Sequence, residues 1–114
     1  MTGVQTCALP ISNNPRWLWE AVALFENQEF VQPRTVSYLA RGAYPTLQQL
    51  NADPNASRQI YDVGYVLGEF IVSQWGRAAF LQLIRTNGDL PGVLGISTPA
   101  FENSWARWLQ DRYF

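Results

Sequence analysis

The 114-residue sequence contains no histidine and no lysine, and it has a single cysteine. Without histidine, the chain offers neither the commonest zinc ligand nor the usual general base near neutral pH. The same absence excludes a Ser-His-Asp triad. The lone Cys7 cannot form an internal disulfide and says nothing about compartment. The commonest catalytic centres are therefore excluded from this chain by itself.

Charge is also scarce: charged residues make up 15% of the sequence, and the net charge is −1. The arginines are scattered without a basic stripe, so the sequence predicts no nucleic-acid partner. The apolar run Val63–Val72 contains Glu69 and is too short to cross a bilayer, so no transmembrane segment is predicted. What is abundant is apolar material, at 47% of residues, which is enough for the core of one domain.

The first twelve residues, MTGVQTCALPIS, have no charge and no regular period. They lack the basic region of a secretory signal, and Pro10 interrupts their short apolar stretch. The string resembles the translation of a synthetic adapter oligonucleotide used in short-read DNA sequencing. This resemblance implies that residues 1–12 are a disordered, adapter-derived artefact and that the natural sequence begins near Ser12 or Asn13. An ordinary disordered N-terminus is the alternative.

Residues 13–114 carry helical patterns and no comparable strand pattern, so we expect an all-α fold of about five helices without a sheet. The first helix should begin at Asn14-Pro15, with asparagine as the cap and proline at the first helical position. Glu20 lies at the edge of its apolar arc and Trp19 lies outside it. The other four tryptophans fall on core faces, which favours packing over a sugar-binding platform; the first arc comprises Trp17, Leu18, Ala21, Val22, Leu24 and Phe25.

The longest predicted helix runs from Ser57 to Trp75, ends at Gly76 and should be largely buried. Within it, Gly64 and Gly68 are one turn apart, which allows another helix to approach closely. Shorter helices are predicted over 46–51 and 77–86, the second stopped by Asn87-Gly88. The last helix should be capped by Ser97 and should pack through Phe101, Trp105, Trp108 and Leu109.

Three segments resemble gluzincin zinc metallopeptidases, the thermolysin-like group within the peptidase-MA-like enzymes. PRWLWEAVALFEN, at 15–27, resembles the segment that follows the HExxH helix, commonly WLxEGxAxY. IYDVGYVLGEFIVSQWG and GISTPAFENSWARWLQDRYF, at 60–76 and 95–114, are similar to later helices of that family. The resemblance implies that residues 13–114 are the helical C-terminal lobe of such an enzyme, lacking an N-terminal lobe that carries HExxH.

Two candidate site residues follow from this resemblance. Glu20 aligns with the third zinc ligand, the carboxylate that accompanies two histidines in a catalytic site; Ala21 stands where the family usually has glycine. The alternative for Glu20 is a surface glutamate paired with Arg16. Tyr61 aligns with a tyrosine whose phenol stabilises the oxyanion, and its alternative is a core tyrosine with the hydroxyl at the rim.

The resemblance implies Zn²⁺ as the cofactor of the intact parent protein, and a peptide or protein as its substrate. HExxH supplies the two histidine ligands and the general base, so we expect this chain alone to be inactive and to bind no zinc. Localisation stays open, and an exported or membrane-associated bacterial parent is one option. Two alternatives remain: a small helical protein-interaction module with an exposed aromatic face, and a non-catalytic family member.

Overall fold

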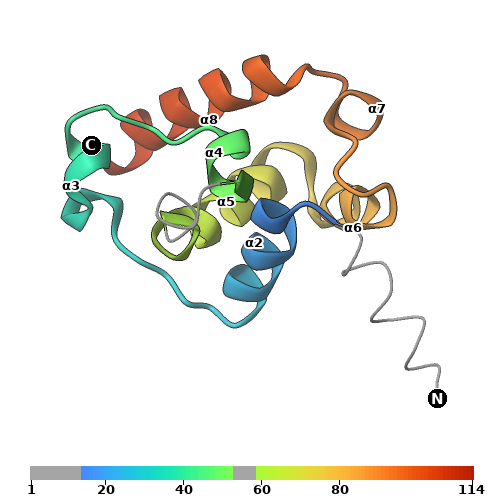
Figure 1. Ribbon diagram of the computed structural model, residues 1–114, viewed down its shortest axis with the longest axis horizontal. Helices are drawn as coiled ribbons and strands as arrows, with labels where there is room; N and C mark the ends of the chain where they lie inside the picture. Colours follow the sequence, from blue (N-terminus) through green and yellow to red (C-terminus); the bar gives the residue numbers. More distant parts are fainter. Residues whose placement is uncertain (1–13, 53–58) are drawn as a thin grey trace.

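A computed structural model describes residues 14–52 and 59–114. The expectations for residues 1–12 and for a helix start at Ser57 lie outside this part of the chain. No strand occurs within the described ranges, which confirms the all-α prediction. They contain more elements than expected, because short helices form beside the long ones (Figure 1): α2 (Arg16–Glu26), the 3₁₀ turn η1 (Pro33–Thr35), α3 (Ser37–Ala40), α4 (Leu47–Ala52), α5 (Ile60–Trp75), α6 (Arg77–Arg85), α7 (Leu90–Leu94) and α8 (Thr98–Tyr113).

Helix α5 forms the centre of the fold, with α2, α6 and α8 packed against it (Figure 1). Its predicted burial is confirmed, since most of its apolar side chains, and both glycines, are inaccessible to solvent. Helix α8 covers the core with the face that its spacing predicts: Phe101, Trp105 and Leu109 are buried, and Trp108 packs partly against them. None of the helices in the described ranges is long and apolar enough to cross a membrane.

The aromatic side chains form much of this core. The Phe101 ring contacts Phe70 at 5.4 Å between centroids, Trp17 at 5.9 Å and Trp75 at 6.3 Å. Such pairs join α2, α5 and α8 through large, rigid surfaces. Trp19, in contrast, is 36% exposed, as its place outside the apolar arc predicts.

Three helix ends match the local sequence signals. Helix α5 ends at Gly76, whose φ of +93° suits a residue without a Cβ. Helix α6 stops at Asn87-Gly88, both with positive φ. The Ser97 hydroxyl accepts a hydrogen bond from the Ala100 amide at 3.3 Å and caps α8.

The predicted start of α2 is wrong in two respects, because Asn14 does not cap it and Pro15 is not its first helical residue. Pro15 occupies the capping position with an extended backbone, and the side-chain amide of Asn14 donates instead to the Ile84 carbonyl at 3.0 Å. The cap comes from elsewhere: Asn51 Oδ1 accepts a hydrogen bond from the Trp17 amide at 2.9 Å. A side chain of α4 therefore satisfies the free donor at this helix end.

The close approach allowed by Gly64 and Gly68 is confirmed, and the helix that approaches is α2. A Cβ at Gly64 would lie 2.4 Å from Leu24 Cδ1 and 3.5 Å from the Ala21 Cα atom. A Cβ at Gly68 would lie 2.8 Å from Phe25 Cβ. This packing sets α2 directly against α5 and so fixes which side chains of the two helices meet.

Candidate functional site

The packing of α2 on α5 brings together the two residues that the sequence singles out. Glu20 lies midway along α2, and Tyr61 lies in the first turn of α5, 41 residues later. The Tyr61 hydroxyl donates a hydrogen bond to Glu20 Oε2 at 3.0 Å. Two positions on separate helices thus form one site at the surface of the helix pair.

Arg16 completes this cluster, which we call the Glu20 site (Arg16, Glu20 and Tyr61). Its Nη2 lies 3.6 Å from Glu20 Oε2, one turn away on the same helix, and donates to the Tyr61 hydroxyl oxygen at 3.3 Å. The Glu20 side chain is only 12% exposed, whereas that of Arg16 is 36% exposed. The carboxylate is therefore largely shielded from solvent, the phenol is exposed, and the guanidinium is partly exposed with its Nε atom buried.

Tyr61 is not a core tyrosine, since 48% of the residue is exposed. Its ring lies beneath the Arg16 guanidinium, with Cζ 6.0 Å from the ring centroid, at the outer limit of a cation–π contact. The hydroxyl is held at a fixed place by a donor and an acceptor from α2. This arrangement can present a phenol beside a carboxylate to a molecule that approaches from solvent.

The side chains of the Glu20 site cannot by themselves supply the ligands of a catalytic zinc ion. Such an ion takes three protein ligands and keeps one position open. Within residues 14–52 and 59–114 there is no group of three His, Cys, Asp or Glu side chains that could hold a metal. Glu20 supplies a single carboxylate, and its Oε2 atom already has a phenol and a guanidinium beside it. The Glu20 site could therefore contribute one carboxylate to a metal site that other residues complete.

Phenol–carboxylate hydrogen bonds recur on α5. Tyr38 of α3 donates to Asp62 Oδ2 at 2.8 Å, and Tyr113 of α8 donates to Glu69 Oε1 at 2.6 Å. Burial, followed by the hydrogen bond to Asp62, raises the pKa of Tyr38 well above its usual value. Burial and the bond to Glu69 likewise raise the pKa of Tyr113. Both phenols are therefore held in the neutral form that can donate to a carboxylate.

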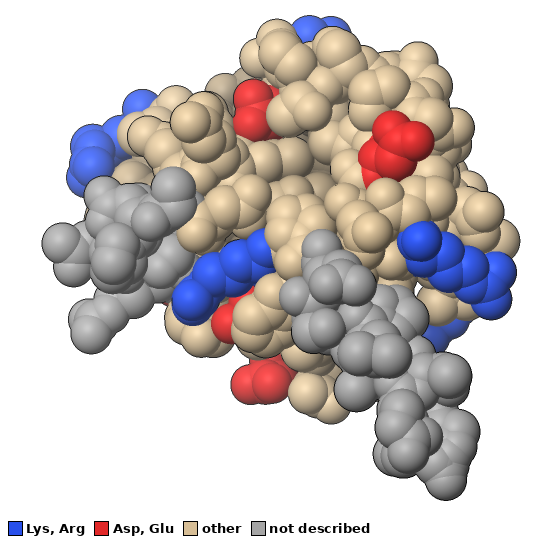
Figure 2. All heavy atoms as spheres, turned by 45° about the vertical axis from the view of Figure 1, so that its right-hand side comes forward, with Lys and Arg blue, Asp and Glu red and all other residues tan. Residues whose placement is uncertain are grey.

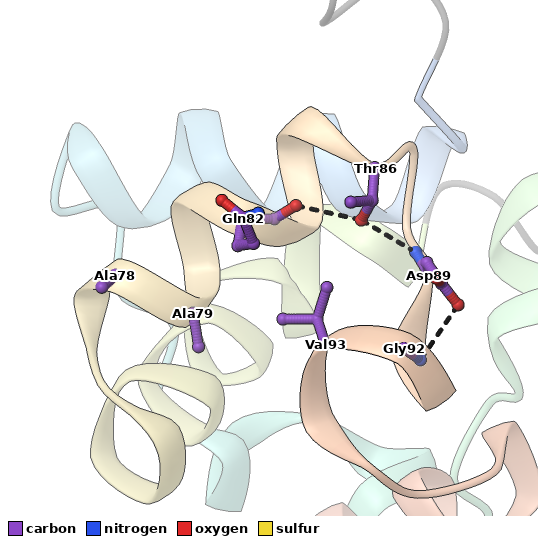
Figure 3. Close-up of a pocket in the computed structure, with 7 residues that line it drawn as sticks. All are labelled: Ala78, Ala79, Gln82, Thr86, Asp89, Gly92 and Val93. Carbon is purple, nitrogen blue, oxygen red and sulfur yellow. Dashed lines mark hydrogen bonds between the residues drawn. The ribbon is translucent and has the colours of Figure 1, made fainter.

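A hollow of about 460 Å³ lies between α6 and α7 (Figure 3), lined by Ala78, Ala79, Gln82, Thr86, Asp89, Gly92 and Val93. Its polar groups serve the helix ends. The Thr86 hydroxyl donates to the Gln82 carbonyl at 2.9 Å, and Asp89 Oδ1 accepts from the Gly92 amide at 3.1 Å as the cap of α7. The polar contacts of this hollow are thus accounted for by the turn between two helices.

A second hollow, of about 570 Å³, lies at the C-terminal end of α2; we call it the α2-end hollow, and it is lined by Phe25, Glu26, Gln28, Phe30, Tyr65 and Arg77. The sequence patterns did not single it out, because its residues come from three helices and a loop. Charged side chains are few on the face shown in Figure 2, most of which is formed by uncharged residues.

No protein-family model, curated protein or solved structure matches this chain.

Proposed function

We propose that the chain is the helical portion of a zinc-dependent metallopeptidase, in which Glu20 is the third zinc ligand and Tyr61 stabilises the oxyanion. The observation that supports this most directly is the 3.0 Å hydrogen bond between the Tyr61 hydroxyl and Glu20 Oε2. A zinc ligand and an oxyanion donor must reach the same reacting group of the substrate. The motif resemblance names these two residues separately, and the packing of α2 on α5 brings them within hydrogen-bond distance.

The zinc ion of the parent enzyme would activate water for attack on the peptide bond. In this chain, α2 holds the Glu20 carboxylate under Arg16, whose positive charge offsets its negative charge when no metal is present. The histidine ligands and the general base would come from an HExxH segment, which this sequence does not contain. The chain alone is therefore proposed to be inactive, and its substrate in the parent is proposed to be a peptide or protein.

A helical interaction module is the second candidate, and two observations favour it. The Arg16–Glu20 pair at helical spacing gives Glu20 a structural partner without a metal. Trp19 is partly exposed on the solvent face of α2, next to the Glu20 site in sequence. Exposed tryptophan is enriched where proteins bind one another, so the partner in this case would be another protein.

The decisive experiment is to read the native genomic DNA upstream of the Asn13 codon. An open reading frame that encodes HExxH shortly before Asn13 would support the metallopeptidase. A native frame that starts near Asn13, or that continues without HExxH, would overturn it in favour of the interaction module.

A biochemical test then uses the parent protein encoded by that frame. We expect Glu20→Gln to abolish hydrolysis of a fluorogenic peptide and to lower the bound zinc content, because a neutral amide is a poor zinc ligand. Glu29→Gln is the matched control, since Glu29 is an exposed glutamate just after the same helix, and it should leave both readings unchanged. Unaltered zinc content and activity in Glu20→Gln would refute the ligand assignment.

A further inference from the structure

The α2-end hollow combines an aromatic wall with a pair of opposite charges. The Tyr65 ring lies 5.3 Å from the Phe25 ring and 5.3 Å from the Phe30 ring between centroids. Phe30 stands at the rim and is 43% exposed. These rings pack against one another in tilted and edge-on geometries, and the exposed Phe30 ring offers an apolar surface to a planar ligand ring in the hollow.

The charged pair is Glu26 and Arg77, with Glu26 Oε1 and Arg77 Nη2 2.6 Å apart. Their side chains are 43% and 58% exposed, and an ion pair so accessible to water contributes little to stability. Opening it to admit a ligand therefore costs little. A ligand that brings its own carboxylate to Arg77 and its own ammonium to Glu26 would replace one ion pair with two.

Gln28 supplies the third observation. It has a φ of +58° and follows the last turn of α2. Its backbone amide donates to the Phe25 carbonyl, and the backbone amide of Glu29 donates to the Leu24 carbonyl. This is the Schellman arrangement, in which glycine is the favoured residue because a side chain is strained at positive φ. The helix end fixes the backbone of Gln28, and its side chain lines the hollow, where the side-chain amide can donate a hydrogen bond to a ligand.

From the aromatic wall, the charge pair and the side-chain amide of Gln28 together, we propose that the α2-end hollow is a binding site for a small zwitterion with an aromatic side chain, that is, an aromatic amino acid. The ring would lie against Phe30 and Tyr65, the carboxylate on Arg77 and the Gln28 amide, and the ammonium on Glu26. This site lies at the opposite end of α2 from Arg16 and does not depend on the proposed peptidase function.

The test is a titration of the whole chain with L-phenylalanine, followed by amide chemical shifts and by calorimetry. We expect shifts confined to the lining residues. Three probes each lack one feature: 3-phenylpropionate has no ammonium, phenethylamine has no carboxylate, and L-alanine has no ring. Each should bind at least about fivefold more weakly than L-phenylalanine, because each leaves one set of contacts unmade. Binding of any of the three probes as tight as that of L-phenylalanine, or no binding of L-phenylalanine at millimolar concentration, would overturn the proposal.

A pair of glycine variants separates ligand binding from folding. Gln28→Gly relieves the strain at positive φ, so it should raise the melting temperature while weakening L-phenylalanine binding at least about fivefold. Asn87→Gly is the matched control, because Asn87 has a φ of +57° at the end of α6, away from the hollow. It should leave binding unchanged. Wild-type affinity in Gln28→Gly would show that the amide takes no part and would overturn the proposal.

Discussion

Replacing Gly68 with alanine is expected to destabilise the fold, although alanine is the better helix former. The added Cβ would lie 2.8 Å from Phe25 Cβ and 3.0 Å from Phe25 Cγ, whereas carbon atoms pack best about 3.5–4.0 Å apart. Both atoms sit close to the backbone of α2, so a rotation of the Phe25 ring cannot relieve the overlap. Helix α2 would have to move away from α5 by several tenths of an ångström or more.

The magnitude follows from two opposing effects. Overpacking of a tight contact costs about 1–3 kcal/mol, and the contact at Gly68 belongs at the upper end because its neighbour is nearly fixed. The gain in helix propensity from glycine to alanine is about 1 kcal/mol. The net loss for Gly68→Ala should thus be about 1–2 kcal/mol, or a fall of roughly 4–16 °C in melting temperature for a chain of this size.

Gly64→Ala should cost less, close to zero after the gain in propensity. The atom nearest to its added Cβ is Leu24 Cδ1, at the end of a flexible side chain, and the nearest backbone atom of α2 is at 3.5 Å, in ordinary contact. The added Cβ thus meets a movable side-chain end in Gly64→Ala and nearly fixed atoms in Gly68→Ala. The difference in unfolding free energy between the two variants tests the packing more sharply than either value alone.

The assay is urea unfolding followed by far-ultraviolet circular dichroism. Gln74→Ala, at an exposed position of α5, is the control and should change stability by less than about 0.5 kcal/mol. In a Phe25→Gly background, Gly68→Ala should no longer destabilise, because both the Cβ and the Cγ atoms that its added Cβ meets are gone. The reasoning would be refuted if Gly68→Ala were as stable as the wild type, or if it cost the same with and without Phe25.

Three further outcomes are expected. Asn51→Ala should lower the free energy of unfolding by about 1 kcal/mol in the same assay, because α2 loses its cap; no change would place the cap elsewhere. Burial and a hydrogen bond to a carboxylate of α5 raise the pKa of Tyr38 above its ordinary value of about 10. The neutral phenol therefore contributes its full stabilisation of the fold below about pH 10, and this contribution is lost as the pH rises further. Denaturation across alkaline pH should accordingly show a shallower loss in Tyr38→Phe than in the wild type. Glu20→Gln should cost less stability than Glu69→Gln, because the contacts of Glu69 to a phenol and a guanidinium, at 2.6 and 3.1 Å, are shorter than those of Glu20, at 3.0 and 3.6 Å; the reverse order would make the Glu20 site chiefly structural.

The sequence predicted those features of the fold that depend on neighbouring residues. Gly76, the Asn87-Gly88 stop and Ser97 act through their own backbone or an amide three residues away, so local patterns suffice. The cap of α2 could not be found in this way, because the acceptor, Asn51, lies 34 residues after Trp17, whose backbone amide donates to it. The spacing of Gly64 and Gly68 predicted a close helix contact, but only the fold identifies the partner as α2.

For the candidate sites too, the sequence indicated single residues, whereas their contacts depend on the fold. Glu20 and Tyr61 came from motif resemblance, and nothing local indicates that their side chains meet, since the contact depends on how far α2 is shifted along α5. The α2-end hollow was not predicted at all. Its clearest local sign was Gln28, a glutamine two residues after the last residue of a helix, but its positive φ is a property of the folded backbone.

The three phenol–carboxylate pairs on the described part of α5 differ in what the fold requires of them. The Tyr38–Asp62 pair fastens the short helix α3 to α5, and the Tyr113–Glu69 pair fastens the last turn of α8. Both attached segments lie at the periphery, where each hydrogen bond contributes to order. The Tyr61–Glu20 pair joins α2 to α5, which the glycine contacts and the buried residues of α2 already hold together. It is also the pair whose tyrosine is most exposed. We therefore expect stability to depend least on the Tyr61–Glu20 bond, and its exposed phenol makes it the pair of the three that a ligand from solvent could exchange with most readily.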